Sequence, residues 1–384
     1  MRVFLFLLLF GFLLSFNAHS QSTDTVSIKC LLKEISSLQS IHSDEFPDGG
    51  FPSYRKYYFN NSSKADYNFF YTAIILFNLQ RYRKFLSDEE KNYVDQIKEK
   101  ALPYFEIFKS KVHADRYNFW QKNPPVIFPN AGWLNWFNKG SALPDDIDCC
   151  AFAMLVIGPK DSSLNDLKKI FLKYRNGNFK TTKSFYKKYQ STPVYNTWLG
   201  EKMPIEIDLG VLANVMMMNS VLGLQMTKTD TASLDLLVDM IKENKHITAS
   251  KYVSPSYENP ATIIYHIARL MTYTDYLPLL NMKPLIVTQA KRLLFKAHYS
   301  LEKLLLTNAL LQLGERNIDK FDLSKEQLER NDYPFFIANM ASLLSNPYKQ
   351  MLSAIKIGRF AYYSYPFNLS LLYENKILRE RVNK

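Results

Sequence analysis

The chain has 384 residues, of which 47% are hydrophobic and 22% charged, and its formal net charge is +12. This balance excludes a disordered or low-complexity protein. The chain has only 12 glycines and no GxGxxG or GxxxxGK[ST] motif, which argues against a turn-dense β fold and a glycine-rich nucleotide loop.

The first twenty residues have the composition of a secretory signal peptide. Arg2 precedes an apolar run from Val3 to Phe16, and Ala18-His19-Ser20 is a small-x-small cleavage site. The run is too short to span a bilayer comfortably, which leaves an uncleaved anchor as the alternative. We therefore expect residues 1–20 to be removed and residues 21–384 to form a single exported domain, periplasmic or secreted, with a peripheral place at a membrane left open.

The expected mature chain contains three cysteines, Cys30, Cys149 and Cys150. The adjacent pair can bond to each other only in a strained ring. The open possibilities are a disulfide from Cys30 to one of the pair, or free thiols that pack as small hydrophobic groups. The histidines are scattered singly and no Cys/His spacing indicates zinc, so neither a metal nor a cofactor is expected.

Helical segments of two kinds alternate along the chain. One set is apolar on all sides, which indicates buried helices: residues 69–79, 148–158, 208–219, 261–271, 301–314 and 335–344. The other set is charged and amphipathic, which indicates solvent-facing helices: residues 87–111, 164–173, 231–244, 284–297 and 325–330. Ser87 and Glu90 form a capping box at the start of the first amphipathic segment. Convincing strand alternation is missing.

Buried helices that alternate with amphipathic ones predict an all-α fold, an α/α toroid with an inner and an outer ring of helices. The alternative is an open superhelix of helix pairs, which a fixed repeat would favour, and no fixed-period motif is present. In a toroid the inner helices run parallel, so their N-termini meet at one mouth. We expect a ligand pocket there.

Four short motifs resemble the terpenoid cyclase and protein prenyltransferase superfamily: DGGFPSYR, LPDDIDCCAFAM, TWLGEKMPIEIDLGVLANV and SPSYENPATIIYHIARL. Members of this superfamily have an α/α toroid, and its cyclases carry a DxDD acid whose middle Asp protonates an isoprenoid double bond. By this resemblance Asp148 takes the place of the acid, while Cys149 stands where the last Asp is expected. The Gln-Trp motifs of squalene cyclases are absent, no prenyltransferase-type zinc site can be assigned, and the length allows a single toroid.

The acids at the expected helix starts have two interpretations. Asp145, Asp146 and Asp148 follow Pro144, where carboxylates cap a helix and oppose its dipole, with Asp145 as the expected N-cap. A regular helix places Asp146 and Asp148 about 200° apart, so they would not face one pocket together. As a catalyst, Asp148 would be a general acid whose apolar neighbours raise its pKa, supported by Asp146 and Asp208. Asp208 is otherwise a helix N-cap.

Candidate substrate-binding residues lie in the loops that lead into the expected buried helices, or inside those helices. They are Tyr54, Arg55, Trp133, Trp136, Trp198, Asn214, Tyr257 and Glu258. The tryptophans would stack on a sugar, line an apolar cavity or only plug the barrel mouth. Asn214 lies in an apolar helix and needs a partner, which a neighbouring helix or a ligand would supply.

A basic, aromatic stretch without any acid runs from Leu167 to Gly200, and we call it the basic strip. Its bases are Lys168, Lys169, Lys173, Arg175, Lys180, Lys183, Lys187 and Lys188. The strip is either a solvated face or a surface for anionic lipid headgroups or an anionic polymer. Nucleic acid is not an expected partner, because the chain has no recognition motif and an exported protein does not meet it.

These patterns leave three functions open. The first is binding of an extended apolar or isoprenoid-type substrate at the helix mouth, with Asp148 as acid. The second is a carbohydrate-active α/α barrel, a glycoside hydrolase or lyase, in which the mouth acids act as an acid/base pair and the tryptophans as sugar platforms. The third is a non-catalytic binding protein on the same fold. Catalysis and the oligomeric state stay open at this point.

Overall fold

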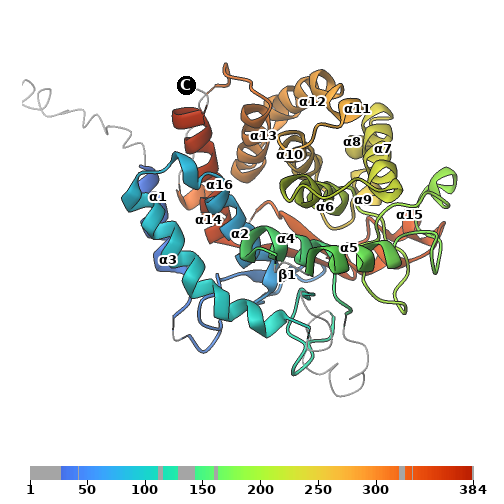
Figure 1. Ribbon diagram of the computed structural model, residues 1–384, viewed down its shortest axis with the longest axis horizontal. Helices are drawn as coiled ribbons and strands as arrows, with labels where there is room; N and C mark the ends of the chain where they lie inside the picture. Colours follow the sequence, from blue (N-terminus) through green and yellow to red (C-terminus); the bar gives the residue numbers. More distant parts are fainter. Residues whose placement is uncertain are drawn as a thin grey trace, which may run out of the picture.

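The computed structural model describes residues 27–41, 43–110, 116–128, 143–159, 163–319, 325–330 and 332–382 (Figure 1). The described chain is mostly helical, which confirms the predicted helical class. The expected signal peptide, residues 1–20, lies outside the described residues. Within the described ranges, no helix is both long enough and apolar enough to cross a membrane.

Six helices of the described chain pack in a cyclic order, and we call them the central helices. They are α2 (Phe69–Arg81), α4 (Ile147–Ile157), α6 (Leu209–Val221), α10 (Pro260–Met271), α13 (Ser300–Gln312) and α16 (Tyr365–Ile377). Each contacts the next in this order, and α16 contacts α2. The first five match expected buried segments, and nearly all their side chains are buried. This burial on every side explains why their sequences are apolar all round.

The sixth expected buried helix, residues 335–344, is not a helix. Phe336–Asn339 is a strand, β3, and Met340–Leu343 is a 3-10 turn. Periodicity alone does not separate a short apolar strand from a buried helical segment, and here the strand is paired with β4 (Arg359–Tyr363). The sixth central place belongs to α16, whose buried asparagines, serine and glutamate make it less apolar than the other central helices.

The expectation that the chain lacks strands is also wrong. The strands β1 (Tyr54–Tyr57), β2 (Ser63–Ala65), β3 and β4 form an antiparallel sheet in the order β2-β1-β4-β3. Tyr362 of β4 lies between Arg55 of β1 and Phe336 of β3 in the ladder. Strands of three to five residues are too short to show a clear alternation, and the central pair joins parts of the chain about 300 residues apart.

Amphipathic helices pack on the central ones, as predicted. The segments around α3 (Asp88–Phe105), α5 (Ser163–Lys173), α7 (Lys228–Lys242), α12 (Lys283–Lys296) and α14 (Lys325–Glu329) are helical where the sequence predicts it. Ser87 and Glu90 form the predicted capping box at the start of α3. Contacts join α3 to α2, α7 to α6, and α12 to both α10 and α13. The remaining helices are α1 (Ile28–Leu38), α8 (Lys245–Thr248), α9 (Ser250–Val253), α11 (Leu277–Leu280) and α15 (Tyr348–Leu352).

All three cysteines of the described chain are free thiols. Cys149 and Cys150 are buried in α4, as expected for thiols that pack as small hydrophobic groups. Cys30 is exposed on α1, so it does not belong to that core. Of the two possibilities left by the sequence, the structure therefore has free thiols and no disulfide among these residues.

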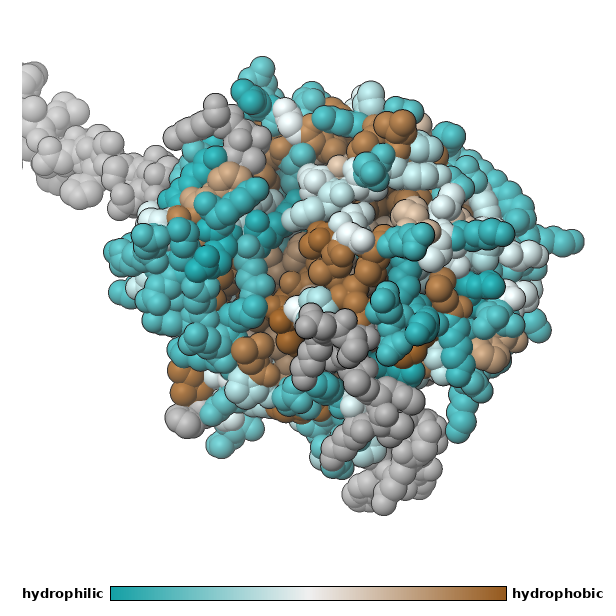
Figure 2. Space-filling model, in the orientation of Figure 1, coloured by the Kyte–Doolittle hydropathy of each residue, from teal (hydrophilic) through white to brown (hydrophobic). Residues whose placement is uncertain are grey.

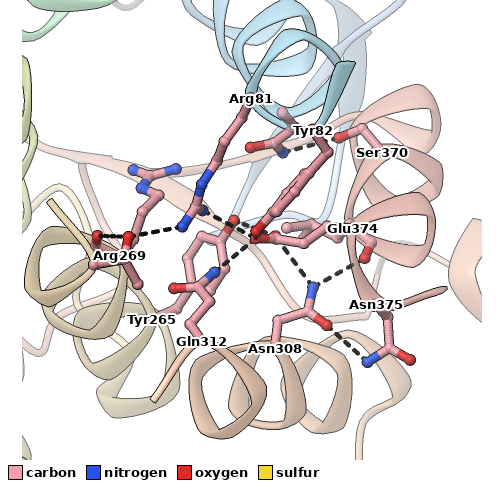
Figure 3. Close-up of polar contacts among 12 residues, drawn as sticks. Arg81, Tyr82, Tyr265, Arg269, Asn308, Gln312, Ser370, Glu374 and Asn375 are labelled. Atoms are coloured by element: carbon pink, nitrogen blue, oxygen red, sulfur yellow. Dashed lines mark hydrogen bonds and ion pairs between the residues drawn. The ribbon is translucent and has the colours of Figure 1, made fainter. Parts of the chain in front are cut away.

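Four central helices share one buried carboxylate. Glu374 of α16 is fully buried and forms an ion pair with Arg81 of α2, with Nη1 and Oε1 3.0 Å apart. Its two oxygens also accept hydrogen bonds from Tyr82, Tyr265, Asn308 and Gln312 (Figure 3). A buried charge is tolerated only when it is paired and its remaining lone pairs are satisfied. Here that requirement links α2, α10, α13 and α16 through a single side chain.

We expect Glu374→Ala to lower the free energy of unfolding by about 3–5 kcal/mol, because it leaves the Arg81 guanidinium buried without its counter-ion. Urea denaturation would measure the change. Glu380→Ala is the matched control: this glutamate is half exposed and pairs loosely with Lys376 at 3.8 Å, so its loss should cost less than about 0.5 kcal/mol. Equal effects of the two substitutions would contradict a cross-linking role for Glu374.

Candidate functional site

A cavity of about 180 Å³ lies at the N-terminal ends of central helices. Residues of α2, α4 and α6 line it, together with β3, β4 and the loops that precede α6 and α10. Its wall is largely aromatic, with Phe70, Phe119, Trp120, Phe128, Trp198, Phe336 and Tyr362. Figure 2 shows apolar residues gathered in the middle of one face, where Figure 1 draws α2, α4 and α6. A concave, mostly apolar site with a few placed polar groups is typical of small-molecule binding.

Three acids line this apolar cavity: Asp146, Asp148 and Glu206. The expectation that Asp146 and Asp148 face different sides of a helix is wrong. Asp146 is the N-cap of α4, with extended backbone (φ −114°, ψ 149°), and its carboxylate accepts the N–H of Cys149. The 3.6-residue periodicity holds only from the first helical residue onward, so both carboxyl groups reach one cavity.

The sequence analysis expected Asp145 to be the N-cap of α4. The N-cap is Asp146 instead. Asp145 is buried one residue earlier and forms an ion pair with Lys122. Asp146 supplies one carboxylate oxygen to the cap, while its other oxygen, Oδ2, has no hydrogen-bond partner. A buried carboxylate oxygen that the fold leaves unsatisfied, at the wall of a cavity, is a candidate for contact with a ligand.

Asp148 is held on both oxygens by side chains from neighbouring segments. It lies in the first turn of α4 and is 5% exposed. Its Oδ1 accepts the amide N–H of Asn214 on α6 at 2.8 Å, and its Oδ2 accepts the O–H of Tyr257 in the loop before α10. Both donors are neutral. They fix the orientation of the carboxyl group without giving it a counter-ion.

The surroundings of Asp148 favour its protonated form. Burial raises the pKa of Asp148 to about 8; the charges of Asp146 and Asp208 add to the rise, and the hydrogen bonds from Tyr257 and Asn214 oppose it. Burial also raises the pKa of Asp146, to about 6. At neutral pH the cavity thus holds one protonated carboxyl group next to one that is largely ionised. Such a pair of separated pKa values is typical of acid/base chemistry.

A second row of buried residues fixes the two donors to Asp148. Arg269 of α10 donates from Nη2 to Oδ1 of Asn214 at 2.6 Å, which orients the amide so that its N–H groups point toward Asp148. The ring of Tyr257 packs on His266 with centroids 4.3 Å apart. Burial and the charge of Arg269 lower the pKa of His266, so the imidazole is neutral. The partners that Asn214 was expected to need are thus supplied by two neighbouring central helices.

Asp208 holds the loop that carries Tyr257. It is the N-cap of α6 and accepts backbone N–H groups of that helix, as one interpretation of the sequence expected. Its carboxylate also accepts the O–H of Ser254 at 2.6 Å and the N–H of Ser256 at 2.7 Å. Asp208 is not part of the cavity wall. Its effect on the site is to position the loop before α10 and to raise the pKa of Asp148 by its charge.

Gly210 gives Tyr257 the room to reach Asp148. A Cβ at this position would lie 2.2 Å from Cδ2 of the Tyr257 ring, which is far inside van der Waals contact. Any larger residue would displace the ring and break its bond to the acid. The glycine in the first turn of α6 is therefore part of the site, although it carries no side chain.

Glu206 is a third cavity acid that the sequence did not single out. Its Oε2 accepts the indole N–H of Trp198 at 2.7 Å, which places that tryptophan in the wall, as predicted for a cavity-lining aromatic. Burial raises the pKa of Glu206, and the charge of Lys349 opposes the rise. Lys349 is itself fully buried without a hydrogen-bond partner, and burial lowers its pKa to about 8.

Five predicted binding residues do not line this cavity: Tyr54, Arg55, Asn214, Tyr257 and Glu258. Tyr54 is partly exposed on β1, and Arg55 is buried with its guanidinium over the ring of Phe360. Glu258 forms an ion pair with Arg359 of β4. Trp133 and Trp136 lie outside the described residues. The tryptophan found in the wall besides Trp198 is Trp120, whose indole N–H is donated to Asp66 at 2.7 Å.

Much of the cavity wall could not be found from the sequence. Phe336 and Tyr362 reach it from β3 and β4, the strands that the sequence analysis missed. Trp120 had one signal, its place near the loop that leads into the second buried helix. Asp146 and Asp148 were found because they stand at a helix start, whereas the aromatic wall depends on a sheet formed by distant segments.

Among the described residues, no group of three or more His, Cys, Asp or Glu side chains is placed to hold a metal ion. No protein-family model matches the chain, and no curated protein and no solved structure matches it. Function therefore has to be inferred from the cavity and the residues around it.

Asp148→Asn should change how stability depends on pH. The folded-state pKa of Asp148, about 8, lies above the unfolded value of about 3.9, so the folded chain binds the extra proton between these limits. The binding of this proton stabilises the folded state. The stabilisation is fully present below the unfolded pKa and is lost as pH rises through about 8. Thermal unfolding across this range should show the wild type losing stability relative to Asp148→Asn, and parallel curves would refute the raised pKa.

Proposed function

We propose that the chain is an α/α toroid that binds the end of an extended apolar, isoprenoid-type substrate in the cavity and uses Asp148 as a general acid. The cyclic contacts of the central helices support the toroid, with the amphipathic helices as its outer layer. An open superhelix would leave its first and last inner helices apart, whereas α16 packs on α2. Residues near the N-termini of α2, α4 and α6 line the cavity, which is where parallel inner helices of a toroid would place it.

The size and lining of the cavity support an apolar ligand. A dry cavity of about 150 Å³ lined by leucine, isoleucine and phenylalanine is known to bind benzene. The cavity of about 180 Å³ therefore suits an isoprene unit, which is close to benzene in size, at the end of a longer chain. Burying such a unit among aromatic side chains removes its apolar surface from water, at about 25 cal/mol per Å².

The protonated carboxyl group at the wall carries the proposal. Asp148 would transfer its proton to one carbon of a substrate double bond, whose π electrons form the new C–H bond and leave a cation on the other carbon. The resulting carboxylate stays bonded to the O–H of Tyr257 and the N–H of Asn214. These two bonds strengthen as negative charge develops, which lowers the barrier for the transfer.

The same wall is suited to the cation that follows. The faces of Phe70, Trp120 and Phe336 attract positive charge through their quadrupoles, and a desolvated cation gains most from this attraction. Asp146, with a free Oδ2 and a pKa of about 6, is an ionised acceptor in the same wall for the proton that the cation must lose. The proton has to return to Asp148 before the next turnover.

The carbohydrate-active alternative receives less support from the site. Sugar binding needs many hydrogen-bonding groups along an open groove, because each hydroxyl must be satisfied. Here Glu206 and Trp198 use their polar atoms on each other, and the rest of the wall is mostly apolar. Identification of a co-purifying ligand by mass spectrometry would separate the two: a bound glycan would overturn the isoprenoid proposal.

Incubation of the purified protein with squalene, geranylgeraniol and geranylgeranyl diphosphate in D₂O tests the acid role directly. Protonation of a double bond from Asp148 should give isomerised or cyclised products that carry deuterium, which mass spectrometry detects. Asp148→Asn should lower the labelling rate by at least about 10²-fold, since general acid catalysis contributes about 10²–10⁴-fold. Tyr257→Phe should reduce the rate by roughly tenfold through loss of one hydrogen bond.

The matched control is Asp166→Asn, which removes an exposed carboxylate on α5 that pairs with Lys169. It should leave the rate and the labelling unchanged. Labelled product from Asp148→Asn at the wild-type rate, in a protein that is still folded by circular dichroism, would refute the proposal.

The rate should also depend on pH in the direction set by Asp148. The acid acts in its protonated form, so kcat/KM should fall as pH rises through about 8. If Asp146 accepts the returning proton, the rate should fall again below about 6, where that carboxylate becomes protonated. A rate that rises steadily above pH 8 would contradict the use of Asp148 as an acid.

A further inference from the structure

The segment that closes one side of the cavity exposes an unusual number of apolar side chains. It connects β3 to β4, and its exposed members are Met340, Leu344, Tyr348, Met351, Ile355 and Ile357, which we call the apolar rim. Met351 and Ile357 are 69% and 63% exposed. In α15, Tyr348 and Met351 are three residues apart and share a helix face, while Lys349 is buried on the other side.

The apolar rim and the cavity are parts of one surface. Met340 lines the cavity and is also 53% exposed, and the adjoining Ser342 and Leu343 line the cavity too. The N–H of Met340 is donated to the carbonyl of Gly358 at 2.9 Å, which folds the two ends of the segment together. A ligand leaving the cavity past Met340 would therefore meet the rim before it meets open solvent.

The basic strip lies directly against the apolar rim. Asn346 donates its backbone N–H to the carbonyl of Lys183 at 2.8 Å and its amide N–H to the carbonyl of Phe185 at 3.0 Å. Figure 1 likewise draws the yellow-green chain of the strip beside α15. Neither segment contains an acid: none occurs from Leu167 to Gly200, or between Asp332 and Glu374.

Half of the eight bases in the basic strip have an acidic partner within the fold. Lys168 pairs with the buried Asp230, and Lys188 pairs with Glu243. Lys169 and Lys173 also have acidic partners. The exposed lysines without an ion-pair partner in the described part of the chain include Lys183 and Lys187 of the strip and Lys356 of the rim segment. Two of these lysines adjoin the rim: the carbonyl of Lys183 accepts the N–H of Asn346, and Lys356 stands between Ile355 and Ile357.

We propose that the apolar rim docks on an anionic lipid bilayer, with Lys183, Lys187 and Lys356 against the headgroups, and that the cavity receives its substrate from that bilayer. Apolar side chains flanked by lysines suit the boundary between acyl chains and anionic headgroups. A polymer of negative charge would use the lysines but would leave the rim in water. This inference rests on the proposed apolar substrate and names the surface from which it is drawn.

Cosedimentation of the mature chain, expected to begin at Gln21, with phosphatidylcholine vesicles that contain phosphatidylglycerol tests the docking. The wild type should bind them, and more weakly at high salt. Tyr348→Ser/Met351→Ser/Ile357→Ser should lower the partition coefficient at least tenfold by removing apolar insertion. Lys183→Gln/Lys187→Gln/Lys356→Gln should lower it by a similar factor, but only for vesicles that contain phosphatidylglycerol.

The matched control carries Leu277→Ser and Phe295→Ser, which remove strongly exposed apolar residues of α11 and α12. It should bind vesicles as the wild type does. Equal binding by the rim variant and this control, or no binding by the wild type, would overturn the proposal. So would light scattering that shows a dimer without vesicles and a monomer for the rim variant, because the rim would then be covered by a second copy.

Asp148→Asn separates this inference from the proposed reaction. This variant should bind vesicles like the wild type, because its substitution is buried and distant in sequence from the rim. Normal vesicle binding with no deuterium labelling by any chain would leave the docking surface standing and refute the acid role. Labelling of a detergent-dispersed isoprenoid by a wild type that does not bind vesicles would do the reverse.

Discussion

The central helices are tied together by buried carboxyl groups that need partners from several helices at once. A carboxyl group cannot be buried without donors, and one helix cannot supply enough donors to its own side chain. Glu374 takes donors from α2, α10 and α13, while Asp148 takes them from α6 and the loop before α10. The order in which the helices pack is thus fixed by polar contacts as well as by apolar volume.

Glu374 and Asp148 differ in the charge of their hydrogen-bond donors. This difference suits Glu374 to a structural role and Asp148 to proton transfer. Arg81 faces Glu374 as a counter-ion. Asp148 has only neutral donors and two acidic neighbours, so its neutral form is favoured and its pKa rises to about 8. The only guanidinium in this chain of contacts, Arg269, acts one residue away through Asn214. If Arg269 contacted Asp148 directly, the acid would be ionised and unable to donate a proton.

The sequence predicts the helices better than the site because helices are local and the cavity is not. The central helices from α2 to α13 are visible as apolar segments since each is buried on every side. α16 was missed because its apolar sequence is interrupted by Asn368, Glu374 and Asn375. The side chains of these residues bond to neighbouring helices. β3 and β4 were missed because their pairing is defined by register between segments, which no single window of sequence contains.

Asp146 and Asp148 also show this difference between what is local in the sequence and what depends on the fold. That Asp146 and Asp148 stand at a helix start is a local property, and the sequence predicts it. That both face one cavity depends on which residue is the cap, and Pro144 with two following aspartates leaves that choice open by one position. A shift of the cap by one residue turns Asp146 from a helical residue into an extended one and brings it to the side of Asp148. The extended backbone of the N-cap therefore brings the carboxyl groups of Asp146 and Asp148 to the same cavity.

The position of the cavity at helix N-termini places a constraint on the chemistry that it can perform. The free N–H groups and dipoles at these ends stabilise negative charge and oppose a cation. In the proposed reaction they would favour the carboxylate that Asp148 becomes when it gives up its proton. The cation of the proposed reaction would gain most at the aromatic part of the wall, where Phe336 of β3 stacks on Phe119 and Tyr362 of β4 meets Phe119 edge to face. The short sheet thus adds an aromatic surface suited to positive charge to the cavity that holds the acid.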